Sequence, residues 1–277
     1  MTNWTGRNLG AAVVAGVAAV TVQASPVEKP VNTLDHVGAV PLVYGSHTVN
    51  ASLSTGVDLD SYTFSGKAGQ QVAIRVQGLS GDLDPLAVLR DPAGVVVDSG
   101  GCAAFAANCS FERLVGLAAD GIYTINISDQ GLNNAGAYQL HLEQYPPTSN
   151  WVGVSYGDPV THALGHATDL DYFAFRGNAG TGVRIGVAGL SGDLDPSLAI
   201  WSPAGAKVSD SGCSVFAANC SFFVDLDLSV GGLYKFAIAE QGMNNVGNYR
   251  VQISCLYGAC PLPTDLPPMI PEPSSWA

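Results

Sequence analysis

Paired aspartates are the residues of this chain whose type and spacing most directly suggest chemistry. Asp58 and Asp60 lie two residues apart, as do Asp82 and Asp84, and both pairs recur 111 residues later. Carboxylates this close repel each other unless a cation, an amide or a hydroxyl group offsets the charge. Because calcium takes about six to eight oxygen ligands, the pairs are candidate calcium ligands. The full set is Asp58, Asp60, Asp82, Asp84, Asp169, Asp171, Asp193 and Asp195.

Turn chemistry is the competing explanation for these aspartates. An Asp before or inside a turn commonly accepts hydrogen bonds from nearby backbone N–H groups and needs no metal. The stretch SGDLDP at Ser80–Pro85 has the Gly and the Pro of such a turn, and it recurs at Ser191–Pro196. The pattern does not match an EF-hand loop, which ends in a Glu. The sequence favours turn stabilisation over calcium binding here.

Six cysteines fall in three close pairs. In an oxidising compartment such pairs are typical of local disulfides. Zinc is disfavoured, because no pair has two-residue spacing and no His lies beside any pair. The expected disulfides are Cys102–Cys109, Cys213–Cys220 and Cys255–Cys260.

An Asn-containing loop, QGLNN at Gln130–Asn134 and QGMNN at Gln241–Asn245, precedes the last strand of each copy of the repeat. The simpler interpretation is a hairpin turn with Asn and Gly at positive φ. The functional alternative is a polar rim that binds sugar hydroxyls. Its candidate ligand-binding residues are Asn133, Asn134, Asn244 and Asn245.

Catalytic motifs are missing from the sequence. His162 and His166 are four residues apart, but no Glu follows His162, so the metalloprotease pattern fails. No G-x-S-x-G elbow occurs. The Asp pairs could in principle serve a glycosidase. Their duplication in two small units is better explained by the fold, so we expect a protein that is not an enzyme and has no catalytic residues.

These residues all belong to one repeated unit. At an offset of 111, FAANCSF at Phe105–Phe111 recurs at Phe216–Phe222. Each copy spans roughly 105 residues, the size of one domain. Segments such as QVAIRVQ (Gln71–Gln77) alternate apolar with polar residues, as half-buried strands do, and turn residues separate them. The sequence therefore predicts an all-β fold with two tandem antiparallel β-sandwich domains, at residues 41–146 and 147–255.

Composition narrows the partners. Charged residues make up 12% of the chain, and 23 acids against 11 bases give a net charge of -12. This charge disfavours nucleic acid and anionic lipid, because phosphate contacts need Lys and Arg. It is compatible with binding a hard cation.

The two ends of the chain carry targeting features. Residues 1–24 read as a secretory signal peptide, with an apolar run in Asn8–Val22 and cleavage expected after Ala24. The alternative is an apolar first helix of the mature fold. The run is too short for a comfortable membrane span, so we expect no membrane span in the chain. A linker is expected at 25–40 and a Pro-rich tail at 256–277.

The order of motifs in each copy resembles the bacterial pre-peptidase C-terminal domain, or PPC domain. The family pattern runs from D-x-D-x-Y/F-x-F through G-D-x-D-P and a PxG hairpin to two G-x-Y strands, and the resemblance extends from Pro41 to about Cys255. It implies jelly-roll-like β-sandwiches that accompany secreted proteases and other exported enzymes. Some relatives bind calcium, and some bind collagen or polysaccharide.

A second resemblance lies in Ile270–Ala277, IPEPSSWA, which is similar to the start of a PEP-CTERM sorting signal. That signal implies an exported protein of a Gram-negative bacterium, often one that makes exopolysaccharide. The membrane helix and Arg-rich end that follow in the family are not in this sequence, so we expect either that the motif is truncated or that the match is due to chance.

Together these features predict a secreted, non-catalytic surface or matrix protein that mediates adhesion or binds exopolysaccharide or a surface protein. One alternative is an accessory or chaperone-like module for secreted hydrolases, stabilised by calcium. A third is a hydrolase that uses the Asp pairs.

Overall fold

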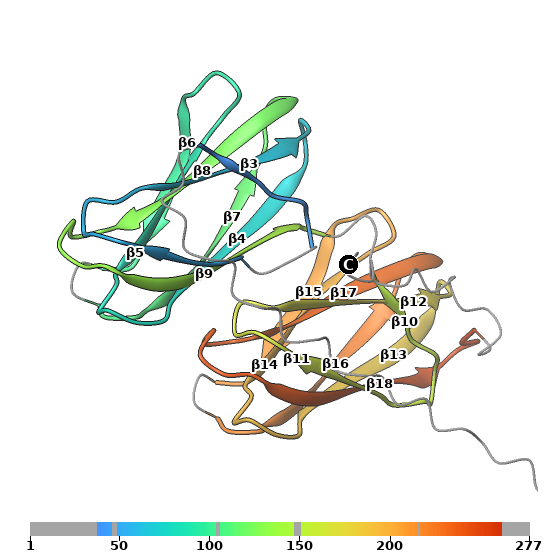
Figure 1. Cartoon of the computed structure of the whole chain (residues 1–277). Helices are drawn as coiled ribbons and strands as arrows, with labels where there is room; N and C mark the ends of the chain where they lie inside the picture. The colour runs from blue at the N-terminus through green and yellow to red at the C-terminus, as the bar shows by residue number, and fades with distance from the viewer. Residues whose placement is uncertain (1–37, 46–48, 104–105, 147–150, 215–216, 262–277) are drawn as a thin grey trace, which may run out of the picture.

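The computed structural model describes residues 38–45, 49–103, 106–146, 151–214 and 217–261. All the regular elements in this part of the chain are β-strands, and they form two β-sandwiches (Figure 1). The predicted all-β fold is confirmed. The expected signal peptide and the PEP-CTERM-like motif lie outside the described residues, as does most of the linker at 25–40. The described residues contain no helix long and apolar enough to cross a membrane.

The first sandwich packs a five-stranded sheet, in the order β1-β3-β8-β5-β6, on a four-stranded sheet, in the order β2-β9-β4-β7. All its strand pairs are antiparallel except the short pair of β1 with β3. The strands are β1 (Val40–Pro41), β2 (Val49–Leu53), β3 (Asp60–Gly66), β4 (Gln71–Gly78), β5 (Pro85–Arg90), β6 (Val96–Gly101), β7 (Ser110–Gly116), β8 (Gly121–Asp129) and β9 (Gly136–Gln144).

The second sandwich repeats this order. Its five-stranded sheet is β10-β12-β17-β14-β15 and its four-stranded sheet is β11-β18-β13-β16. The strands are β10 (Val152–Gly153), β11 (Val160–Leu164), β12 (Leu170–Gly177), β13 (Thr181–Gly189), β14 (Pro196–Trp201), β15 (Lys207–Gly212), β16 (Ser221–Leu228), β17 (Gly232–Glu240) and β18 (Gly247–Tyr257).

Each core lies between the two sheets of its sandwich. In β4 the inward residues Val72, Ile74 and Val76 are fully buried, as the alternating sequence predicts. In the second sandwich the aromatic rings of Phe173 and Phe236 stack with their centroids 5.1 Å apart. Burial of such apolar surface contributes about 25 cal/mol per Å² and stabilises each sandwich on its own.

The Asn-containing loops are not hairpin turns, so that interpretation was wrong. Strand β8 belongs to the five-stranded sheet and β9 to the four-stranded sheet, so Gln130–Asn134 crosses from one sheet to the other. The residues at positive φ are Leu132 and Met243, not Asn or Gly. The crossing loop adopts this conformation because its backbone N–H groups turn toward a buried acidic side chain, described below.

A third apolar cluster joins the two sandwiches. Ala73 points outward from β4 and is fully buried against the five-stranded sheet of the second sandwich. Tyr145, just after β9, packs edge-on against Trp201 at a centroid distance of 4.6 Å. The four-stranded sheet of the first repeat therefore covers the five-stranded sheet of the second. The residues buried here are Ala73, Leu170, Tyr172, Trp201, Ala237 and Ala239.

Candidate functional site

Three loops meet at one end of the first sandwich: the SGDLDP turn, the loop of the first disulfide and the Asn-containing loop. The backbone N–H of Asn108 donates to the Leu83 carbonyl at 3.0 Å. The side-chain amide of Asn134 donates to the Asp82 carbonyl at 2.7 Å. We call this arrangement the loop cluster. The predicted disulfides are confirmed as Cys102–Cys109, Cys213–Cys220 and Cys255–Cys260.

Asp129, at the end of β8, organises the loop cluster. One carboxylate oxygen accepts the backbone N–H of Asp84 at 3.0 Å, and the other accepts those of Asn133 and Asn134 at 2.9 and 3.2 Å. Burial alone would raise the pKa of Asp129, but these backbone N–H groups outweigh it and lower the pKa. Sequence analysis missed this residue, although an acid directly before Gln-Gly recurs as Glu240.

The second repeat builds the same loop cluster around Glu240. Its carboxylate accepts the backbone N–H of Asn244 at 3.1 Å, and the Asn245 amide donates to the Asp193 carbonyl at 2.9 Å. Here burial dominates and raises the pKa of Glu240. The candidate residues Asn133 and Asn244 are exposed in both clusters, whereas Asn134 and Asn245 are partly buried.

The SGDLDP turn needs its glycine and its left-handed aspartate. A Cβ atom on Gly81, at φ 75°, would lie 1.8 Å from the Ala135 carbonyl oxygen. Asp82 and Asp193 have φ values of 55° and 56°, a region that Asp tolerates better than most residues. Asp84 and Asp195 are fully buried beneath the turn.

The two residues of the other acidic pair in the first repeat, Asp58 and Asp60, have different roles. The Asp58 carboxylate accepts the backbone N–H and the hydroxyl of Ser54 at 2.7 and 2.8 Å, and the N–H of Leu59 at 2.9 Å. The backbone N–H of Ser54 is the main cause that lowers the pKa of Asp58. Asp60 is buried and accepts the hydroxyl of Tyr138 at 2.5 Å.

The corresponding pair of the second repeat keeps these roles and adds a histidine. Asp169 accepts the backbone N–H of Gly165 at 3.0 Å. Asp171 accepts the Tyr249 hydroxyl at 2.6 Å and lies 2.8 Å from Nδ1 of His162. Burial raises the pKa of Asp171 to about 6, although His162 opposes that effect.

These hydrogen bonds occupy carboxylate oxygens that a calcium ion would need as ligands. Among the described residues, no group of three or more His, Cys, Asp or Glu side chains is arranged to hold a metal ion. Both carboxylate oxygens of Asp58 already accept protein donors. These acids do not make a closed ligand set for calcium, and calcium binding stays a prediction.

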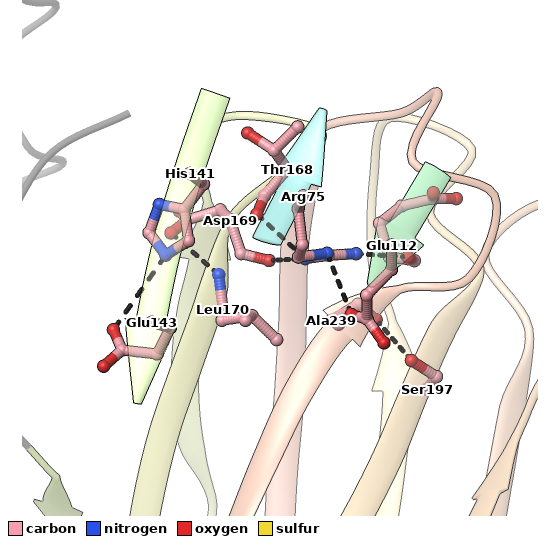
Figure 2. A network of polar contacts seen from close by, with 10 residues as sticks. Arg75, Glu112, His141, Glu143, Thr168, Asp169, Leu170, Ser197 and Ala239 are labelled. Carbon is pink, nitrogen blue, oxygen red and sulfur yellow. Dashed lines mark hydrogen bonds and ion pairs between the residues drawn. The ribbon is translucent and has the colours of Figure 1, made fainter. Parts of the chain in front are cut away.

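The two repeats are joined by a buried arginine that sequence analysis did not single out. Arg75, pointing outward from β4, donates to the backbone carbonyls of Thr168, Asp169 and Glu240 at 2.9, 2.5 and 3.1 Å. Its Nε lies 3.3 Å from a carboxylate oxygen of Glu112 on β7. Burial lowers the pKa of Arg75, and Glu112 opposes that effect. Figure 2 shows the guanidinium between Glu112 and the Thr168–Asp169 backbone.

His141 and Glu143 lie on β9, on the same outer sheet face as Arg75. His141 is the residue of β9 that pairs with Arg75 of β4 (Figure 2). Both are buried. Burial lowers the pKa of His141 to about 4 and raises the pKa of Glu143 to about 8. Both side chains are therefore neutral at neutral pH, and Arg75 and Glu112, which both belong to the first repeat, form an ion pair beside them.

One known family matches this chain. The model of the bacterial pre-peptidase C-terminal domain matches residues 58–129. A PPC domain lies in the first repeat. The match begins at Asp58 and ends at Asp129, so both the Ser54-bound acid and the organiser of the loop cluster belong to the PPC domain.

Solved structures give more distant likenesses. The pre-peptidase C-terminal domain of collagenase from Bacillus anthracis is 19% identical, with a TM-score of 0.30, and the match covers 38% of this chain and 95% of that one. PliG from Aeromonas hydrophila, a periplasmic inhibitor of g-type lysozyme, has the same identity and coverages and a TM-score of 0.29. The PBSX exported protein XepA is 11% identical over 82% of this chain and 90% of its own, with a TM-score of 0.26. No curated protein matches the sequence.

Proposed function

We propose that this chain is a secreted, non-catalytic surface or matrix protein that binds exopolysaccharide or a surface protein through its two loop clusters. The second repeat acts as a second PPC-like module. The observation that carries the proposal is the repetition of one loop cluster, with an exposed Asn in each copy, on two sandwiches joined by Arg75. Two joined sites gain avidity over one, because the second binding event becomes intramolecular.

The chemistry of the acids supports a binding role over a catalytic one. A hydrolase that uses two carboxylates needs both of them facing one substrate. Asp58 is held by Ser54 and Leu59, while Asp60 is buried against Tyr138. The pair therefore stabilises a turn and a core. The exposed amides of Asn133 and Asn244 are the groups that contact sugar hydroxyls in this proposal, and the Asn133 amide also donates to Asn134 at 3.0 Å.

Substitution of the exposed amides tests the proposal. We expect the double variant Asn133→Ala/Asn244→Ala to bind purified exopolysaccharide or whole cells several-fold more weakly, because each lost hydrogen bond costs about 1 kcal/mol. The matched control is Ser65→Ala/Ser229→Ala, which removes two exposed hydroxyls elsewhere on the same two sandwiches. Equal retention of both double variants and the unaltered protein would refute the role of the loop clusters.

Calcium is tested separately by thermal unfolding of residues 25–277 with calcium and then with excess EDTA. A ligand of the folded state raises the midpoint by mass action. A calcium-dependent rise that is lost in Asp82→Asn/Asp193→Asn would assign calcium to the SGDLDP turns. An unchanged midpoint at millimolar calcium would remove the metal from the proposal.

A hydrolase-accessory role is the second candidate, and the family match favours it, because that family is described by its position beside peptidases. The two candidates differ in the partner. Capture of a purified secreted hydrolase, with no retention on polysaccharide, would favour the accessory role.

A further inference from the structure

Each sandwich has two outer sheet faces, and the contact between the repeats uses one face of each sandwich. The first repeat contributes the outer face of its four-stranded sheet, and the second contributes the outer face of its five-stranded sheet. The four-stranded face of the second repeat and the five-stranded face of the first remain outside this contact. Among the residues that the structure describes, one copy of each kind of face is therefore free.

The free five-stranded face of the first repeat keeps an apolar rim. Leu59 and Leu132 are 54% and 59% exposed, whereas Leu170 and Met243, at the same positions of the second repeat, are each 8% exposed. The loop of Leu132 lies against the turn before β3, since a Cβ on Gly56 would approach the Asn133 backbone to 2.7 Å. The rim is thus the exposed counterpart of a surface that the second repeat buries.

The free four-stranded face of the second repeat presents a large, ordered aromatic group. Phe223 is 57% exposed on β16, and the guanidinium of Arg184 lies 3.9 Å from its ring centroid. Two hydrogen bonds to Asp225, at 2.6 and 2.7 Å, hold that guanidinium in place. The ordered side chains lower the entropy cost of docking this face.

The positions that form the internal contact carry different side chains on the two free faces. Inside the molecule a small residue, Ala73 on the four-stranded face, meets the large Tyr172 and Trp201. On the free faces the four-stranded side carries Arg184 at the position of Ala73, and the five-stranded side carries Ser61 and Arg90 at the positions of Tyr172 and Trp201.

The free faces also carry the donor and the acceptor that correspond to one polar bond of the internal contact. The hydroxyl of Ser110, at the start of β7, donates to the Met243 carbonyl across the internal contact at 2.9 Å. Ser221 occupies the same position in the second repeat and is exposed, and Leu132 offers the corresponding carbonyl. The buried arginine is not preserved, because Gly186 stands where the first repeat has Arg75.

We propose that copies of this chain associate head to tail, with the Phe223 face of one copy docking on the Leu59–Leu132 rim of the next. The occupant is a second copy because the internal contact already joins these two kinds of face, and each chain has one of each left. Such a contact is heterologous, so it grows into open chains of molecules unless the rotation between copies closes a ring. Without the counterpart of Arg75, it is weaker than the internal contact.

The test is sedimentation velocity of the mature protein over a wide concentration range, with two single variants. Leu132→Glu disables one face and Phe223→Glu disables the other. We expect the unaltered protein to form a series of oligomers at high concentration. Each variant alone stays monomeric, with binding weakened by about tenfold or more, because a carboxylate is costly to bury without a partner.

Mixing the variants gives the sharper result. An equimolar mixture still holds one intact face of each kind, so it forms a 1:1 dimer and nothing larger. Val230→Glu, an exposed apolar position in the turn before β17, is the control and associates like the unaltered protein. All the altered positions are exposed, and unchanged thermal midpoints verify folding. A protein that stays monomeric at every concentration, association that persists in either variant, or a mixture without dimer would overturn the proposal.

Discussion

Replacement of Arg75 is the most informative perturbation of the molecule. The guanidinium makes three hydrogen bonds to carbonyls of the second repeat and one ion pair with Glu112, and it is buried. In Arg75→Met, the carbonyls and the Glu112 carboxylate lose this partner while the apolar stem is retained. A carbonyl left without its donor costs about 1–3 kcal/mol when it is buried, so the three carbonyls together account for at least about 3 kcal/mol. Glu112 adds little, because its side chain is 33% exposed and is rehydrated. We expect a loss of this size in the free energy that couples the two repeats.

Trp201 provides the assay, because it is buried in the contact between the repeats. The other tryptophans, Trp4, Trp151 and Trp276, are replaced by Phe so that the signal comes from Trp201 alone. In Arg75→Met we expect its fluorescence to shift to the red at denaturant concentrations where each sandwich is still folded. Unfolding then separates into two transitions. Arg184→Met is the matched control, since Arg184 also lies on a four-stranded face and pairs with an acid, but at the surface. An exposed pair is worth about 0–1 kcal/mol, so this control should change little.

The reasoning is refuted if Arg75→Met is no more destabilising than Arg184→Met, or if Trp201 stays buried until both sandwiches unfold. Either result would mean that the apolar cluster alone holds the repeats together.

Three further predictions concern single residues. Because burial raises the pKa of Glu143 from 4.5 to about 8, its contribution is full below pH 4.5 and is lost as the pH rises through 8; the thermal midpoint should therefore fall from pH 5 to 8 in the unaltered protein and less in Glu143→Gln. Tyr138→Phe removes the hydroxyl that donates to buried Asp60 and should lower the free energy of unfolding by about 1–3 kcal/mol in urea titrations, while Tyr44→Phe, at a partly exposed hydroxyl, should cost less. Gly81→Ala should lower the thermal midpoint more than Gly94→Ala, because only Gly81 has a backbone atom within van der Waals distance of the added Cβ; equal shifts would contradict the close approach seen in the loop cluster.

The strands and disulfides could be predicted from sequence because their signals are local. The alternation of apolar and polar residues in Gln71–Gln77 predicts that Val72, Ile74 and Val76 face the core, whichever sheet packs against this strand. The spacing of Cys102 and Cys109 is enough to suggest the bond between them. Both kinds of signal depend on residues within one short segment.

The contact between the repeats could not be predicted in the same way. Arg75 reads as an ordinary outward-facing residue of a half-buried strand, and its acceptors lie 93 to 165 residues further along the chain. Those acceptors are carbonyls, which every residue has. One available hint is the difference between the copies, Arg75 against Gly186, which marks a position where the two repeats have different surroundings.

The acidic pairs show a different limit. Spacing correctly places Asp58 and Asp60 near one strand, but it does not tell which carboxylate is buried. Asp60 begins β3 with its side chain on the core side, where Tyr138 reaches it, whereas Asp58 precedes the strand and closes a turn with Ser54. A donor from a distant segment, Tyr138, decides the role of Asp60, whereas the donors to Asp58 lie within four residues of it.

Retention of the mature protein on purified exopolysaccharide and on whole cells tests the central claim most directly. The account predicts saturable binding by folded, disulfide-bonded protein, with no hydrolysis of the polysaccharide during the assay. Absence of retention on both the polysaccharide and the cells, or release of soluble sugar by the protein alone, would contradict it.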